Sequence, residues 1–114
     1  MALKLMPGET RNYTFKLPDP ISSIDSIDVR FFQDGGKIVE YDETQTNNVY
    51  QVAGEENLLV CTLPRADTLL FENKIPASVQ IEWSIGNYHS IAKEQRISVG
   101  NYLNKDFLES GGTV

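Results

Sequence analysis

The chain holds one histidine and one cysteine, the two side chains best suited to chemistry near neutral pH. His89 follows Gly86-Asn87-Tyr88, and no serine or cysteine nucleophile can be tied to it from the sequence. A histidine acts as a general base only when its reaction partner lies within hydrogen-bond reach. We therefore interpret His89 as an exposed residue of a hairpin loop. Cys61 lies in an apolar run, which predicts a buried and inert thiol.

Acidic residues occur in three close pairs: Asp25 with Asp28, Asp42 with Glu43, and Glu55 with Glu56. A calcium site or a glycosidase centre needs several converging carboxylate oxygens, and none of these spacings resembles a calcium-binding loop. We predict that these pairs lie on solvated faces and in turns. The sequence thus predicts no catalytic residue, no metal ligand, no cofactor and no enzymatic activity.

Composition limits the partners of this chain. Its 114 residues carry Lys+Arg 10 against Asp+Glu 16, a net charge of −6. Binding to a phosphate backbone depends on Lys and Arg, so we expect no nucleic-acid partner. The single cysteine excludes an internal disulfide, and the length predicts one domain because domains of about 100–200 residues are typical.

The sequence predicts no membrane partner and no signal peptide. Pro7-Gly8 interrupts the N-terminal apolar residues before they reach the length of a signal-peptide core. No segment approaches the roughly 20 apolar residues of a membrane-spanning helix. We therefore expect the chain to fold in a cytosol.

Apolar and polar residues alternate with period two along most of the chain, which indicates half-buried strands. The turns Asp34-Gly35-Gly36 and Gly86-Asn87 predict β-hairpins. Strands are predicted near residues 12–17, 27–32, 37–41, 49–52, 58–63, 78–85 and 91–99. In the last of these, the side chains that face inward between Ile91 and Gln95 are ambiguous, as is typical of an edge strand.

Two further features complete the expected fold. Pro64 through Glu72 predicts one helix of a couple of turns, with Ala66, Leu69 and Leu70 on its apolar side. Trp83 alternates with apolar residues on one strand face, which favours a place in the core. The fold class predicted is all-β and mainly antiparallel: an immunoglobulin-like β-sandwich of about seven strands with one short helix.

Residues 1–100 are predicted to form the β-sandwich domain, and residues 101–114 a C-terminal tail. The tail holds four apolar side chains, Tyr102, Leu103, Phe107 and Leu108. Such a segment either docks on its own domain or offers an apolar contact to a partner. The sequence leaves both alternatives open, and these four residues are the candidate partner-binding residues.

The order of motifs resembles small proteins encoded among the structural genes of phages and prophages of Gram-positive bacteria. The motifs that carry the resemblance are Gly8-Glu9-Thr10, Phe32-Gln33-Asp34-Gly35, Asp67-Thr68-Leu69-Leu70, Val79-Gln80-Ile81-Glu82-Trp83 and Ile97-Ser98-Val99. Pro64 departs from the Ser or Thr helix cap that is usual there, and residues 110–114 match the usual ending only loosely.

The resemblance implies a β-sandwich similar to the N-terminal domains of some phage baseplate and fibre proteins, with no catalytic residues to carry over. It implies a virion, tail or baseplate component that binds other phage structural proteins and is located in the virion or the bacterial host cytoplasm. The ambiguous edge strand also makes a homo-oligomer an open alternative. A second hypothesis is a carbohydrate-binding module that stacks sugars on exposed tyrosines, namely Tyr41, Tyr50, Tyr88 or Tyr102.

Overall fold

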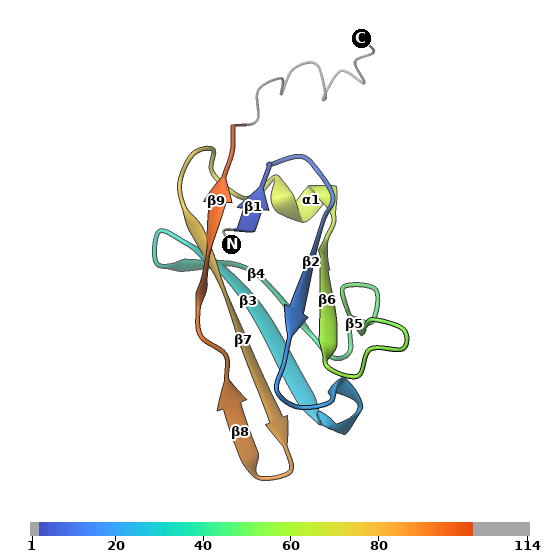
Figure 1. The fold of residues 1–114 in the computed structure, drawn as a ribbon. Helices are drawn as coiled ribbons and strands as arrows, with labels where there is room; N and C mark the ends of the chain where they lie inside the picture. Colours follow the sequence, from blue (N-terminus) through green and yellow to red (C-terminus); the bar gives the residue numbers. More distant parts are fainter. Residues whose placement is uncertain (1–2, 102–114) are drawn as a thin grey trace.

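The computed structural model describes residues 3–101, which form two β-sheets packed face to face (Figure 1). The strands are β1 (Leu3–Leu5), β2 (Arg11–Lys16), β3 (Ser26–Gln33), β4 (Gly36–Asp42), β5 (Val49–Gln51), β6 (Leu58–Leu63), β7 (Ala77–Ile85), β8 (Tyr88–Ile91) and β9 (Gln95–Val99). The helices are one 3-10 turn, η1 (Ile21–Ser23), and α1 (Arg65–Thr68).

The strand order is that of an immunoglobulin domain. One sheet runs β2-β6-β5, and the larger sheet runs β1-β9-β7-β3-β4, with β8 pairing with β7 as well. In immunoglobulin domains strands B, E and D neighbour one another in one sheet, and strands C, F and G in the other, extended in variable-type domains by C′ beside C. The all-β, immunoglobulin-like sandwich with one short α-helix is thus confirmed.

Strand β1 was not expected from the sequence, and it is the parallel strand of the larger sheet. It pairs with β9 from Leu3 opposite Ile97 to Leu5 opposite Val99. Three residues ahead of a Pro-Gly turn show too little alternation to indicate a strand. The partner strand, at the other end of the described chain, supplies the hydrogen bonds that make it one.

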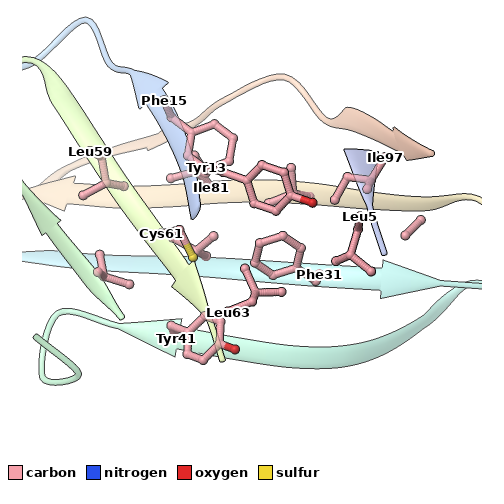
Figure 2. Close-up of a cluster of buried hydrophobic side chains, with 14 of the residues drawn as sticks. Leu5, Tyr13, Phe15, Phe31, Tyr41, Leu59, Cys61, Leu63, Ile81 and Ile97 are labelled. Atoms are coloured by element: carbon pink, nitrogen blue, oxygen red, sulfur yellow. The ribbon is translucent and has the colours of Figure 1, made fainter. Parts of the chain in front are cut away.

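Aromatic side chains from both sheets meet in the core between them. Phe31 of β3 is fully buried, and its ring centroid lies 6.0 Å from that of Tyr13 on β2. Phe71 meets Phe31 edge to face at 6.3 Å. Figure 2 shows Phe31 among side chains of both sheets, including Leu5, Leu63 and Cys61. Such aromatic pairs add stability beyond their buried area.

Both predictions for single core residues are confirmed. Trp83 is 3% exposed, and its indole N–H donates a hydrogen bond to the carboxylate of Asp19 at 2.9 Å. Cys61 is completely buried in β6. Burial raises the pKa of the Cys61 thiol to about 12, so the reactive thiolate is scarce at neutral pH.

The helix is shorter than expected, and its predicted apolar side is wrong. Helix α1 has four residues, and Pro64 before it is extended. Ala66 and Leu70 are exposed, whereas Thr68 and Phe71 are buried. A spacing of three and four residues identifies one helix face, but a single turn is too short for that face to be set by its own periodicity.

Thr68 is buried, and its hydroxyl hydrogen-bonds to the segment that joins β1 to β2. The Oγ1 atom donates to the backbone carbonyl of Glu9 at 2.6 Å and accepts from the Gly8 N–H at 3.1 Å. A buried hydroxyl needs such partners to offset its lost hydration. One polar residue therefore occupies a position that hydropathy alone assigns to a leucine.

The two predicted hairpins are confirmed. Asp34 and Gly35 form the β3–β4 turn with φ of 56° and 78°. This left-handed pair is typical of a type I′ turn. Gly86 begins the β7–β8 turn with φ of 57°, and Ile85 pairs with Tyr88 across it.

The last predicted strand is two strands joined by a bulge. Glu82 pairs with Ile91, but Val79 pairs with Gln95, so three steps along β7 correspond to four along the final segment. The extra residue reverses which side chains point outward. Ile91 is consequently 58% exposed while Ile97 is fully buried, which resolves the ambiguity in the sequence.

Candidate functional site

The outer face of the larger sheet is the solvent-facing side of β4, β3, β7, β8 and β9. Inward side chains such as Val29 and Phe31 alternate with the outward ones along β3. Three cross-strand rows cover the outer face: Lys37–Phe32–Ser78–Arg96, Glu40–Arg30–Gln80 and Asp42–Asp28–Glu82–Ile91. Charged residues predominate in these rows, and the uncharged ones are Phe32, Ser78, Gln80 and Ile91.

Arg30 is the centre of an ion-pair network on the outer face. Its guanidinium lies 2.9 Å from Glu40, 3.3 Å from Glu82 and 3.3 Å from Asp28. Lys37 also pairs with Glu40, at 2.7 Å. The hydrogen bonds from Lys37 and Arg30 hold the pKa of Glu40 at about 2. These contacts link three strands and leave Arg30 little freedom to meet a ligand.

The histidine is exposed, as predicted, but lies in strand β8 rather than in a loop. Its Nε2 atom is 3.2 Å from a carboxylate oxygen of Glu82, and this hydrogen bond is the main cause of the lowered pKa of Glu82. Ser84 is the cross-strand neighbour of His89, yet its hydroxyl oxygen lies 2.5 Å from that of Ser26. His89 and Ser84 therefore have other partners and do not form a nucleophile–base pair.

The carboxylate pairs lie on faces and in turns, where their oxygens accept local hydrogen bonds. Asp25 accepts from the Gly86 N–H and Glu43 from the Ile27 N–H. Burial is the main cause of the raised pKa of Asp28, opposed by Arg30 beside it. Within residues 3–101, no cluster of three His, Cys, Asp or Glu side chains is arranged to hold a metal ion.

The β7–β8 hairpin has an open edge. Strand β8 pairs with β7, and β1 reaches only Ile97–Val99 further along, so no described strand covers the other side of β8. The Ala92 N–H donates to the Ile81 carbonyl, which by alternation directs the backbone groups of His89 and Ile91 away from β7. Tyr88 is 64% exposed. Figure 1 shows the hairpin reaching past the end of the smaller sheet.

A hollow of about 490 Å³ lies at the other end of the outer face. The short side chain of Ser78 separates Phe32 on one side from Arg96 on the other. Gln80 and Glu94 extend the lining along β7 and toward the bulge. The hollow therefore combines one aromatic ring with donors and acceptors of both charges.

The structure describes three of the tyrosines proposed for sugar stacking and none of the predicted partner-binding residues. Tyr102, Leu103, Phe107 and Leu108 lie outside the described residues. The expectation that Tyr41 is exposed is wrong, because it faces inward opposite Val29, is 3% exposed and donates its hydroxyl to Asp67. Burial raises the pKa of Tyr41.

The other two candidate stacking tyrosines in the described residues, Tyr50 and Tyr88, do not form a stacking platform. Tyr50 is 41% exposed on β5 of the smaller sheet, whereas Tyr88 lies on β8 of the larger one. The hollow was not predicted from the sequence. The signal for it was Phe32, a large aromatic residue in phase with the polar residues Asp28 and Arg30 of an alternating strand.

No family model and no curated protein sequence matches this chain. Among solved structures it is similar to the Ig-like domain of mouse leukocyte-associated immunoglobulin-like receptor 1, crystallised as a strand-swapped dimer, at 13% identity and a TM-score of 0.48, over 88% of each chain. It is also similar to a chain of the ZIG-8–RIG-5 IG1–IG1 heterodimer, at 12% identity and a TM-score of 0.48, over 88% of this chain and 82% of that one.

Within the described residues, no helix is long and apolar enough to cross a membrane. The fold assignment rests on the strand order of the two sheets. That order, together with two β-hairpins whose strands alternate inward and outward side chains and with an aromatic core, identifies the described part of the chain as an immunoglobulin-like β-sandwich.

Proposed function

We propose that this chain is a non-enzymatic module that acts by binding another protein, as a structural component of a phage or prophage particle. The open edge of β8 is the observation that carries the proposal. Its backbone donors and acceptors at His89 and Ile91 point away from β7, and Ile91 is 58% exposed beside them. A partner strand that pairs here gains main-chain hydrogen bonds and an apolar contact at once.

The composition of β8 supports this use of the edge. Strands that must stay unpaired usually carry lysine or proline, or end in a bulge. Tyr88-His89-Ser90-Ile91 has neither lysine nor proline, and the bulge follows only after Ile91. By contrast, edge strand β4 carries Lys37 and Glu40, which form an ion pair. The hairpin is therefore the less protected of these two edges.

The phage assignment is supported by the order of sequence motifs described above. The expected partners are other proteins of the same particle, in a virion or in the bacterial host cytoplasm. Mass spectrometry of particles purified from a producing strain tests this directly. The protein is expected at a fixed ratio to the other structural proteins, and its absence from intact particles would refute a virion role.

A pair of matched variants tests the binding edge. Ile91→Lys places a charge on the open edge, whereas Leu70→Lys places one on a side chain of similar exposure, 55%, beside α1. We expect Ile91→Lys to lose co-purification with particles while its melting temperature stays unchanged. Leu70→Lys is expected to co-purify normally. Equal co-purification of both variants would exclude β8 as the binding edge.

The same edge offers a route to a homo-oligomer. Light scattering on the purified full chain measures the mass in solution, and Ile91→Lys and Leu70→Lys are compared at equal concentration. An edge-paired dimer is expected to dissociate in Ile91→Lys and persist in Leu70→Lys. A dimer that survives in both variants would place the self-association surface elsewhere.

A further inference from the structure

The bulge between β8 and β9 directs two charged side chains onto the outer face. In the β8 register the odd-numbered residues face outward, since Ile91 lies opposite Glu82. After the extra residue the even-numbered ones do, and Arg96 lies opposite Ser78. Continued one step, this register places Glu94 beside Gln80. Bulges commonly redirect side chains next to binding sites.

Glu94 and Arg96 differ from the charged residues in the middle of the same face. Arg30 contacts three carboxylates, whereas no ion pair or side-chain hydrogen bond joins Glu94 or Arg96 to another side chain in the described part of the chain. Both are exposed and line the hollow. Their hydrogen-bonding groups are therefore available to a ligand.

Phe32 supplies an apolar surface on the other side of the hollow. It lies on the outward side of β3, only partly buried, and it does not belong to the core between the sheets. Its cross-strand neighbours are Lys37 and Ser78, neither of which covers a ring as another aromatic would. One face of a phenyl ring next to polar side chains suits a ligand that is itself apolar on one side and polar at its rim.

We propose that this hollow is a binding site for a pyranose sugar ring. The C–H face of the sugar lies against Phe32, and its hydroxyls reach Glu94, Arg96 and Gln80. A sugar hydroxyl donates and accepts, so a carboxylate, a guanidinium and an amide can all be satisfied by neighbouring hydroxyls. The lining carries Asp34 and Glu94 against Arg96, which favours a neutral ring over a phosphate or another small anion.

The ¹⁵N–¹H spectrum of the full chain, titrated with single sugars, tests this site. The probes are the methyl glycosides of glucose, galactose, rhamnose, N-acetylglucosamine and N-acetylgalactosamine. At least one is expected to shift the amide signals of Phe32, Gly35, Ser78 and Arg96. The absence of any shift up to the solubility limit of all five probes would overturn the proposal, as would shifts confined to the β8 edge or β5.

Two variants with matched controls locate the contacts. Phe32→Leu keeps an apolar side chain but removes the ring, and Tyr50→Leu does the same to an exposed aromatic on the smaller sheet. Glu94→Gln removes a carboxylate from the hollow, and Glu55→Gln removes one from a distant turn. Phe32→Leu, which removes the stacking face, and Glu94→Gln, which replaces a charged hydrogen-bond acceptor by a neutral one, are each expected to weaken binding roughly tenfold. Both controls are expected to bind normally.

Glu94→Gln keeps the test decisive if Phe32→Leu fails to fold, because Glu94 is exposed and its substitution alters no described contact. Unchanged affinity in Glu94→Gln would by itself overturn the site, as would a folded Phe32→Leu variant that binds sugar normally. The sugar site is separate from the proposed protein-binding edge. Ile91→Lys is therefore expected to bind sugar normally, so failure of one proposal is distinguishable from failure of the other.

Discussion

Strand β7 runs through two regions that share the same alternation of inward and outward side chains but differ in how far the inward side chains are buried. In the body of the sandwich, its inward residues Val79, Ile81 and Trp83 are 1–3% exposed. Beyond Trp83 the same strand continues into the hairpin, where Ile85 is only half-buried and Tyr88 across the turn is 64% exposed. The alternation determines the side of the sheet to which each side chain points. The side chains on the inward side are buried only where the opposing sheet covers them.

The largest effect on stability is expected at Trp83, the last fully covered position of β7. Trp83→Ala is expected to lower the free energy of unfolding by ~3–5 kcal/mol, the range for truncating a large buried aromatic. Urea denaturation followed by circular dichroism measures it. Trp83→Phe keeps most of the apolar contact and loses the hydrogen bond to Asp19, so it is expected to fall in between. An unchanged midpoint for Trp83→Ala would place this residue outside the core.

A smaller loss of stability is expected when the Thr68 hydroxyl is removed, because it hydrogen-bonds to the segment between β1 and β2. Thr68→Val is nearly isosteric but leaves the Glu9 carbonyl and the Gly8 N–H without this hydroxyl. A buried backbone group that loses its partner costs about 1–3 kcal/mol, and urea denaturation detects a change of that size. Thr14→Val, on the exposed side of β2, is the control and is expected to be nearly neutral. Equal stability of the two variants would show that the Thr68 hydrogen bonds contribute nothing.

A smaller effect on stability is expected from the ion pairs of Glu40 on the outer face of the larger sheet. The pKa of Glu40 is lowered to about 2 from its ordinary value of 4.5, by hydrogen bonds from Lys37 and Arg30. A carboxylate with a lowered pKa in the folded state contributes stability above pH 4.5, and this contribution is lost as the pH falls toward 2. Because the pair is partly solvated, Glu40→Gln is expected to cost at most about 1 kcal/mol at pH 7.

Urea unfolding of wild type and Glu40→Gln across this pH range measures the effect. The two proteins should converge at the acid end. A difference between them that stayed constant from pH 7 to pH 2 would contradict an electrostatic origin. Glu55→Gln, in an exposed turn, provides a baseline for removing one carboxylate.

The smallest effect on stability is expected in the hairpin. Ile91→Thr keeps a β-branched side chain in β8 and removes an apolar group that is already 58% exposed. Surface changes of this kind usually stay within about 0.5 kcal/mol of wild type. A thermal melt therefore separates Ile91 from Ile97, whose equivalent change in the core is expected to be clearly destabilising. A large loss in Ile91→Thr would mean that the hairpin edge is covered.

Much of the sandwich could be predicted from local patterns. Asp34-Gly35 and Gly86-Asn87 specify hairpin turns because glycine and aspartate tolerate positive φ. Trp83 was placed correctly in the core by alternation. These features depend on neighbours within a few residues, which is the range over which sequence patterns are reliable.

The predictions were wrong where contacts with residues distant in the sequence determine whether a side chain is buried. Tyr41 was expected to be exposed, but it faces the core on β4 and its hydroxyl reaches Asp67. The apolar side of α1 was misassigned because Thr68 finds hydrogen-bond partners in the segment that joins β1 to β2. The sandwich body was predictable from its sequence, whereas the hollow beside Arg96 was not.

Local sequence patterns are enough to predict most of the strands, the tight turns and the division of most side chains between two faces, since backbone sterics and alternation act locally. Contacts between distant parts of the chain set which faces are covered and make Leu3–Leu5 a strand. They also place one extra residue after Ile91, which turns Glu94 and Arg96 toward Phe32. Pairing register depends on strands that meet from opposite ends of the chain. Those long-range pairings create both the open edge of β8 and the hollow on the outer face.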